Sequence, residues 1–219
     1  MMQMTSEKVE KTPNKIYRTV KFKIVGFQIY FFFIHSCNTI IRLVKLRFIM
    51  SFNLVFETKR LIFRNFTIDD AALIYHLNKD PEVVRYTLDP MHSLQQAHEV
   101  LEKIILPQYA LYNYGRWAVH EKSDLNFLGW CGLKYRPELN EIDLGYRYQK
   151  KAWGKGYATE AAFASLEYGF SKLRLNRIVG RALPENLASI RVLEKCEMQY
   201  LGEDFIEGYL HKTYEKIAN

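Results

Sequence analysis

The sequence predicts a mixed α/β domain built around a largely antiparallel sheet. Helical patterns with recognisable caps alternate with short strand patterns, and three consecutive strand patterns are separated only by turn-type segments. With 48% hydrophobic and 25% charged residues, the chain has the composition of an ordinary globular protein.

The first elements of this domain follow from local signals. Leu61–Phe66 ("LIFRNF") has the pattern of a strand, and "TIDD" at Thr67–Asp70 is a capping box that begins a helix. Asp80-Pro81 ends that helix, because the residue before proline avoids the helical region. Ser93 is placed to cap the next helix. The predicted inner face of this second helix is Ala97, Val100, Leu101 and Ile104.

The remaining elements alternate between strands and helices. Strands are predicted at Arg116–Glu121, Phe127–Tyr135 and Glu141–Tyr148, with "KSDLN" and "RPELN" as the turns between them. A long helix should then reach about Lys172, followed by a buried strand at Arg177–Leu183. The helix "ENLASIRVLEKC" comes next, with a predicted inner face of Leu187, Ile190, Leu193 and Cys196. Strands at Gln199–Phe205 and Tyr209–Lys216 close the chain.

Charge separates the chain into a tail and a body. The formal net charge is +7, but residues 1–50 hold nine Lys/Arg and two Asp/Glu, while residues 51–219 hold 22 of each. The body therefore shows no excess of positive charge for DNA or RNA, and we expect no nucleic-acid partner. We predict an N-terminal extension over residues 1–50 and one domain over residues 51–219.

The extension has three interpretations. The segment Ile24–Ile41 contains no charged residue and is long enough for a membrane helix. Polar side chains in its second half nevertheless make it a poor membrane span. We favour Met50 as the true start, with the preceding residues untranslated or unordered. The alternatives are a membrane anchor and a basic, aromatic helix lying in the membrane interface.

The cysteines and histidines exclude two classes of site. Cys37, Cys131 and Cys196 form no CxxC pair, and the six histidines form no metal-binding motif. We therefore expect no disulfide framework, no metal and a reducing, cytoplasmic location. Cys131 is interpreted as a small core residue.

The stretch Lys151–Ala162 ("KKAWGKGYATEA") is the most informative in the chain. Gly154 and Gly156 open a helix that has no short polar cap, so its first N–H groups are left free and a ligand can approach closely. Three lysines, Lys150, Lys151 and Lys155, and the helix dipole add positive charge. This pattern predicts a phosphate or diphosphate site. A Walker A loop is absent, and the dinucleotide pattern fails at its third glycine, where Thr159 stands.

Two segments resemble a known family. "KAWGKG" from Lys151 resembles the [Q/R]-x-x-G-x-[G/A] pyrophosphate loop of the GNAT N-acetyltransferases, with lysine in place of Gln or Arg. "LPENLASIRVLEKCEM" resembles the N-x-x-S helix of the branch related to ribosomal-protein-alanine N-acetyltransferases, with Cys196, Glu197 and Met198 where that branch has x-Gly-Phe. The resemblance covers about Val55 to Lys216.

The resemblance implies a GNAT fold and acetyl-CoA as co-substrate. The fold has a mostly antiparallel sheet that splays between two parallel strands, here Glu141–Tyr148 and Arg177–Leu183, with helices on both sides. The pantetheine arm would pair with the backbone of Tyr146–Tyr148, and the backbone of Lys151–Gly156 would cradle the pyrophosphate. The implied cofactor-binding residues are Tyr146, Arg147, Tyr148, Lys151, Ala152, Trp153, Gly154, Lys155, Gly156, Tyr157 and Asn186.

The resemblance also implies a direct attack of an amine on the thioester. Ser189 would protonate or orient the sulfur, although Asn186 and Ser189 also fit a plain helix cap. We propose Glu141 or Asp143 as the base, since residues two apart on a strand share a face. Glu160 ranks below them, and Trp153 is more often a packing anchor than a ligand contact.

The acceptor is expected to be a protein N-terminus or a small amine. Its pocket would come from Asp80–Tyr114, with Tyr86, Tyr109, Tyr112 and Tyr114 as lining or packing residues. The protein would act as a monomer or homodimer. The alternatives to an N-acetyltransferase are a non-catalytic acyl-CoA-binding sensor or scaffold of the same fold, and a membrane-tethered interaction protein.

Overall fold

The computed structural model describes residues 3–12, 15–24, 27–33 and 53–218. The chain separates into two compact units, Met1–Ser51 and Phe52–Asn219. Within the first unit, β1 (Gln3–Thr12), β2 (Lys15–Ile24) and β3 (Phe27–Phe33) form an antiparallel sheet in that order. Phe27–Phe33, inside the uncharged segment Ile24–Ile41, is therefore a strand. The rest of that segment after Phe33 and the expected start at Met50 lie outside the described residues.

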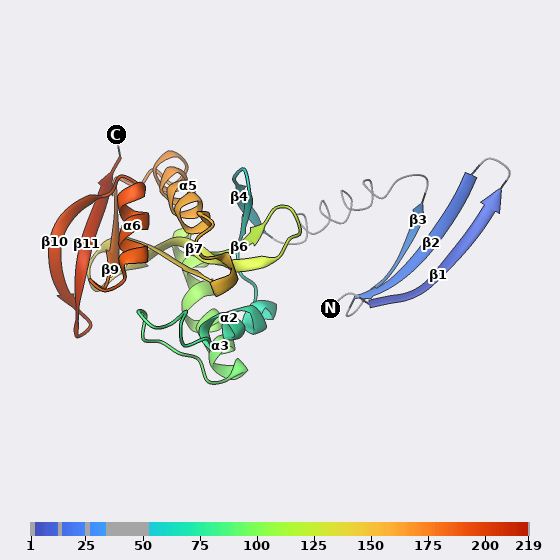
Figure 1. Cartoon of the computed structure of the whole chain (residues 1–219), viewed down its shortest axis with the longest axis horizontal. Coiled ribbons are helices and arrows are strands. Elements are labelled where there is room, and N and C mark those ends of the chain that lie inside the picture. The colour runs from blue at the N-terminus through green and yellow to red at the C-terminus, as the bar shows by residue number, and fades with distance from the viewer. Residues whose placement is uncertain (1–2, 13–14, 25–26, 34–52, 219) are drawn as a thin grey trace. The chain divides into compact units, whose positions relative to one another are not determined.

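The second unit is organised by an eight-stranded sheet. Its strands are β4 (Leu54–Glu57), β5 (Leu61–Arg64), β6 (Arg116–Glu121), β7 (Phe127–Arg136), β8 (Glu141–Tyr148), β9 (Arg177–Ala182), β10 (Gln199–Ile206) and β11 (Tyr209–Ile217). They lie in the order β10-β11-β9-β8-β7-β6-β5-β4 (Figure 1). Every neighbouring pair is antiparallel except β8 and β9. The predicted fold class is confirmed.

The parallel pair β8–β9 is short. Only Asp143↔Val179 and Leu144↔Gly180 are in register, whereas β8 pairs with β7 along its whole length. Past Leu144, the side of β8 that faces β9 is therefore unpaired among the described strands. The two strands part from that point, as the resemblance to the GNAT family implies.

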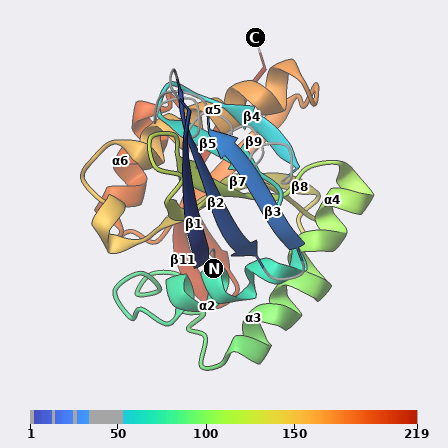
Figure 2. The ribbon, with the colours of Figure 1, turned by 90° about the vertical axis from the view of Figure 1, so that its right-hand side faces the viewer.

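Helices cover both faces of this sheet. They are α2 (Ala71–Asn78), α3 (Leu94–Val100), α4 (Leu106–Tyr112), α5 (Tyr157–Ser171) and α6 (Leu187–Lys195), with short 3₁₀ turns at Ile68–Asp70 and Lys150–Ala152. Figure 1 shows α5 and α6 on one side of the sheet and α2 and α3 on the other, and Figure 2 shows the same layers turned by 90°. Among the described residues, no helix has both the length and the apolar character that crossing a bilayer requires.

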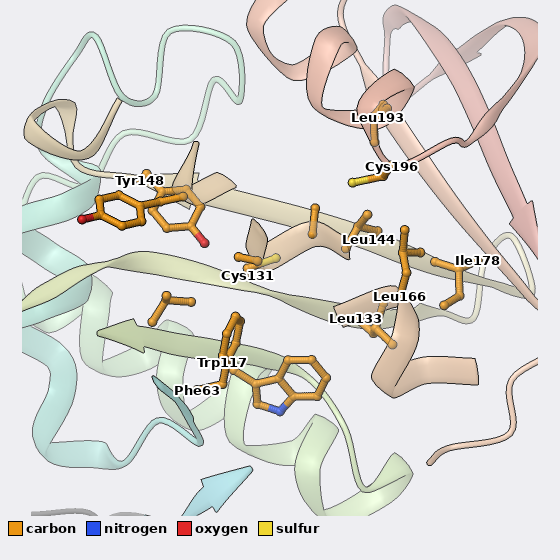
Figure 3. Packing of buried hydrophobic residues seen from close by; sticks show 14 of the residues in the cluster. Phe63, Trp117, Cys131, Leu133, Leu144, Tyr148, Leu166, Ile178, Leu193 and Cys196 are labelled. Atoms are coloured by element: carbon orange, nitrogen blue, oxygen red, sulfur yellow. The ribbon is translucent and has the colours of Figure 1, made fainter. Parts of the chain in front are cut away.

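The main core lies between the sheet and α5 and α6. Leu133 and Leu144 of the sheet, Leu166 of α5 and Leu193 of α6 belong to one buried cluster, and each is at most 2% exposed. Figure 3 shows Leu133 close to Leu166, and Leu193 beside Cys196. Ala161, Ala162 and Ser165 form the fully buried inner face of α5. A Cβ at Gly169 would stand only 2.8 Å from Ile178 Cδ1, which explains why a small residue is needed there.

Within the second unit, the structure departs from the sequence-based prediction at β4 and at the inner faces of two helices. Strand β4 was not predicted. The residue buried after Leu101 is Ile105 and not Ile104, which is 46% exposed, because a π-helical turn at Leu101–Ile105 adds a residue and shifts the inner face. Leu187 is 58% exposed because it occupies the first position of α6 and points away from the core.

Candidate active site

The glycine loop after β8 has the geometry that phosphate binding requires. Gly154 and Gly156 have φ values of +71° and +77°, a region that L-residues rarely adopt, and both are exposed. Gly156 caps α5 without a side chain. Within the described part of the chain, the backbone N–H groups of Gly154, Lys155 and Gly156 donate no hydrogen bond. The N–H groups of Ala152 and Trp153 are used inside the loop, on the carbonyl oxygens of Gln149 and Lys150.

Positive charge accompanies these donors. Lys151 and Lys155 are exposed and make no ion pair with another described residue, whereas Lys150 is bound to Glu82. Two lysines and the N-terminus of α5 thus surround a set of free backbone donors. This is a fitting site for the pyrophosphate of a coenzyme A molecule.

The loop is held from outside by the turn between β4 and β5. Arg60 Nη1 donates to the carbonyl oxygen of Lys155 at 2.9 Å, and Arg60 Nε binds Glu160 Oε2 at 2.6 Å. Thr58 Oγ1 donates to Glu160 Oε1 at 2.6 Å. Burial raises the pKa of Glu160, but these hydrogen bonds and the Arg60 charge outweigh it and lower the pKa below its usual value. Glu160 therefore joins the helix to the sheet.

Two residues of the predicted set anchor the loop from its own side. Ala152 is buried, and the indole Nε1 of Trp153 donates to the carbonyl oxygen of Tyr148 at 2.8 Å while the residue stays 45% exposed. Tyr148 is buried against the loop, and its hydroxyl has no hydrogen-bond partner within the described residues. Burial raises the pKa of Tyr148, so this hydroxyl remains protonated.

Arg147 has a separate structural role. Its side chain is 7% exposed and donates from Nη1 to Asn78 Oδ1 at 2.6 Å and from Nη2 to Asp89 Oδ1 at 2.8 Å. It therefore fastens the segment after α2 to β8. Only its backbone lies on the strand edge that the sequence-based prediction assigns to pantetheine.

A cavity of about 410 Å³ opens at the splay between β8 and β9. It brings together four of the predicted site residues, Asp143, Tyr146, Asn186 and Ser189. Glu141, Arg147, Tyr148 and the loop Lys151–Tyr157 do not line it. The remaining lining residues are Tyr86, Thr87, Leu88, Arg116, Trp130, Arg136, Leu144, Gly145, Arg181, Ala182, Leu183, Ile206, Glu207, Tyr209 and His211.

The first turn of α6 carries both predicted polar residues. Asn186 Oδ1 accepts from the backbone N–H of Ser189 at 3.1 Å, so Asn186 is the helix cap as well as a lining residue. The Ser189 side chain hydrogen-bonds to the Tyr146 phenol, an interaction that opposes the effect of burial on the pKa of Tyr146, and Ser189 lines the cavity.

The two candidate bases differ in their surroundings. Asp143 lines the cavity and forms an ion pair with Arg116, whose Nη1 also donates to the carbonyl oxygens of Gly132 and Asp143. Glu141 binds Arg177 Nη1 at 2.9 Å and Arg181 Nη2 at 2.5 Å. Burial raises the pKa of Glu141, but the two guanidiniums outweigh it and hold the pKa below its usual value. That direction makes Glu141 a weaker base.

The predicted acceptor region contributes less than expected. Of its four tyrosines only Tyr86 lines the cavity. Tyr109 donates to the carbonyl oxygen of Arg116 and accepts from the Phe66 N–H at 3.1 Å, and Tyr112 packs against Tyr114 and Tyr135. These three tyrosines are packing residues, because the Tyr109 hydroxyl is bound by the backbone and the rings of Tyr112 and Tyr114 pack against each other.

Sequence reasoning missed the arginines and the β10–β11 hairpin. Arg116, Arg136 and Arg181 come from three different strands, and Ile206–His211 closes the cavity from the far end of the chain. The only available signal was alternation along each strand, which gives a face but not the neighbouring strand. Cys131 is fully buried, and burial raises its pKa to about 12, so it is a core residue. Among the described residues, no cluster of three or more His, Cys, Asp or Glu suits a metal ion.

The splayed sheet and the glycine loop define an acyltransferase of the coenzyme A type. The profile of the acetyltransferase (GNAT) domain matches residues 60–199. The chain belongs to the GNAT family of acetyltransferases and is an acetyl-CoA-dependent acyltransferase.

Relatives and solved structures agree with this assignment. An uncharacterised N-acetyltransferase of Bacillus licheniformis, p20, is 32% identical over 162 residues, which cover 73% of this chain and 86% of that protein. The crystal structure of a GNAT-family acetyltransferase from Bacillus anthracis matches with a TM-score of 0.63 at 24% identity, covering 75% of this chain and 98% of that one.

Two further structures share the fold at lower identity. The ribosomal-protein-S5-alanine acetyltransferase of Vibrio fischeri matches with a TM-score of 0.58 at 21% identity, covering 75% of this chain and 96% of that one. Spermidine N-acetyltransferase of Vibrio cholerae, in complex with CoA and spermine, matches with a TM-score of 0.60 at 21% identity. The match covers 73% of this chain and 96% of that one.

Proposed function

We propose that this protein transfers the acetyl group of acetyl-CoA to a primary amine, carried by a protein N-terminus or a small molecule. The observation that carries this proposal is the unpaired edge of β8 past Leu144, which leads from the glycine loop to the cavity at the splay. A pantetheine arm paired with that edge would deliver its thioester to Ser189 and Asp143.

The loop Lys151–Tyr157 would hold the pyrophosphate. Gly154, Lys155 and Gly156 supply free N–H donors, and Lys151 and Lys155 supply charge. The backbone edge of residues 146–148 would pair with the amides of pantetheine, with Tyr146 as its open part because the Tyr148 carbonyl oxygen already accepts from Trp153 Nε1. Since this edge and the loop adjoin in sequence, one rigid segment would fix both ends of the cofactor arm.

Transfer would proceed by direct attack. The neutral amine adds to the thioester carbon, the C–S bond breaks, and CoA leaves as a thiolate that takes up a proton. Asp143 is the favoured acceptor of the amine proton, directly or through water, because it lines the cavity and Glu141 does not. The Ser189 hydroxyl would donate to the sulfur.

Calorimetric titration of the protein with acetyl-CoA, and in parallel with ATP and NAD, tests the proposal. We expect saturable binding of acetyl-CoA alone, followed by CoA release when an amine is supplied. A folded protein that binds acetyl-CoA but releases no CoA with any amine would instead be an acyl-CoA-binding sensor or scaffold. A folded protein that does not bind acetyl-CoA would refute the proposed role of the loop.

A further inference from the structure

The cavity at the splay has a distinct balance of charge. Three guanidiniums and two carboxylates line it. Both carboxylates are already held by lining arginines, Asp143 by Arg116 and Glu207 by Arg136. The cavity therefore offers no unpaired carboxylate to a cationic group of a ligand.

Arg181 is the lining cation that remains. Its partner Glu141 does not line the cavity and is shared with Arg177. The Arg181 side chain is only 8% exposed, and its Nε and Nη1 are buried without a hydrogen-bond partner among the described residues. Buried unpaired donors on a charged group are unfavourable, so an acceptor atom from a ligand would stabilise them.

The aromatic lining does not offset this excess of positive charge. Trp130 is the best cation–π partner in the cavity wall, but the guanidiniums of Arg116 and Arg147 already lie 5.2 and 5.4 Å from its ring centroid. A second ammonium on the ligand would find like charge at this wall. The other large apolar lining residues, among them Leu88 and Ile206, suit an uncharged body.

We propose that the acceptor is an amine that also carries a carboxylate, that Arg181 binds this carboxylate, and that polyamines are poor acceptors. The inference rests on the proposed transfer to an amine and adds the class of amine. It separates this cavity from one suited to spermidine, the substrate named for the Vibrio cholerae protein of similar fold.

The experiment compares matched amines with the full chain and saturating acetyl-CoA, measuring CoA release. Each amino acid is paired with the amine left when its carboxylate is replaced by hydrogen, such as phenylalanine with phenethylamine and γ-aminobutyrate with propylamine. Spermidine is included. We expect at least one carboxylate-bearing amine to exceed both its partner and spermidine by about tenfold in kcat/KM, the effect of one charged hydrogen bond.

Two variants locate the preference. Arg181→Gln should lose most of this tenfold ratio between matched amines, and Arg181→Lys should keep part of it. Arg177→Gln is the control, because Arg177 also binds Glu141 but does not line the cavity, and its ratio should stay at the wild-type value. Thermal melting of all three checks folding, and the wild-type ratio stands even if a variant fails to fold.

The outcomes separate this inference from the proposed function. Higher kcat/KM for spermidine than for every carboxylate-bearing amine would overturn the inference and leave amine acetylation intact. So would acetyl-CoA binding without acetylation of any carboxylate-bearing amine, or an equal loss of the ratio in Arg177→Gln and Arg181→Gln. Failure of the folded wild type to bind acetyl-CoA would overturn the proposed function itself.

Discussion

The hydroxyl of Tyr146 donates a hydrogen bond to the backbone carbonyl oxygen of Ser189 at 2.9 Å. This bond joins β8 to the first turn of α6 across the point where β8 and β9 part. Burial raises the pKa of Tyr146, so the phenol remains a protonated donor at physiological pH. The separation of the two strands is therefore bridged by a side chain where backbone pairing has ended.

Replacing Tyr146 with phenylalanine tests this bridge. The Tyr146→Phe variant should lower the free energy of unfolding by about 1 kcal/mol, the usual net contribution of one hydrogen bond. Turnover should fall with it, since Ser189 is positioned by the same turn. Urea unfolding and CoA release measure the two effects.

The control is Tyr135→Phe, because the Tyr135 hydroxyl also makes one hydrogen bond, to Asn140 Oδ1 at 2.8 Å, but at an exposed position. It should cost less stability and leave turnover unchanged. If Tyr146→Phe behaves like this control, the bridge does not hold the site together.

Much of the fold could be predicted because its signals are local. The glycine loop and the cap at Asn186 each depend on residues within one short segment, whereas the splayed pair joins distant strands and was expected only from the resemblance to the GNAT family. The shift from Ile104 to Ile105 could not be predicted, because a π-helical turn has no simple sequence pattern. Strand β4 has only four residues at the edge of the sheet, so it carries little alternation.

The candidate site was predictable only in part, for a different reason. Glu141 and Asp143 were placed correctly on one face, but the arginines that bind them come from β6 and β9. Which strand neighbours which is set by tertiary pairing, and a single sequence does not display it. Arg181 thus became a candidate only once the register of β9 against β8 was known.

The glycine loop gives a direct test of cofactor binding. Gly154→Glu should abolish acetyl-CoA binding, since a carboxylate would stand beside the pyrophosphate and the left-handed φ of +71° would be strained. Space is not the obstacle, because no atom lies within 4 Å of a Cβ at this position. Calorimetry measures the loss.

Gly154→Asn separates charge from backbone strain, since asparagine tolerates the left-handed region. This variant should retain measurable affinity for acetyl-CoA. Unchanged affinity in a folded Gly154→Glu protein would remove the loop from the binding site.

The choice between the two carboxylates can be made by amide substitution. Asp143→Asn should lower kcat by about a hundredfold, the usual order of general base catalysis. Glu141→Gln should keep most of the turnover, because Glu141 does not line the cavity and its two arginine partners hold it as an anion. Steady-state kinetics on both variants, with melting curves to check folding, decide between them. A larger loss in Glu141→Gln would reverse the assignment.

Ser189 is tested by removing its hydroxyl. Ser189→Ala should reduce kcat by about a hundredfold if the hydroxyl donates to the leaving sulfur, while calorimetry should show unchanged acetyl-CoA affinity. The backbone bonds of Ser189 to Asn186 and Tyr146 do not involve the hydroxyl and should persist. Ser171→Ala, at an exposed position on α5, is the control. Full activity in Ser189→Ala would leave this residue as a helix-cap neighbour only.

The buried His120 should make the stability of the protein depend on pH. It is 4% exposed, and its Nε2 accepts from Arg64 Nε at 3.1 Å, so the ring is neutral with its proton on Nδ1, facing the Leu125 carbonyl oxygen at 2.9 Å. Burial and the nearby Arg64 charge lower the pKa of His120 from 6.5 to about 4. The unfolded chain therefore binds one more proton than the native protein between these two pH values.

The sign of the effect follows from this difference in bound protons. The contribution of His120 is fully present above pH 6.5 and is lost as the pH falls toward 4. Because one pKa unit corresponds to about 1.4 kcal/mol, up to about 3 kcal/mol is at stake. Urea unfolding of His120→Gln should show a smaller fall in the free energy of unfolding over this range than the wild type. His76→Gln, at an exposed histidine on α2, should match the wild type. If the free energy of unfolding changes equally with pH in all three proteins, His120 is not held neutral by the fold.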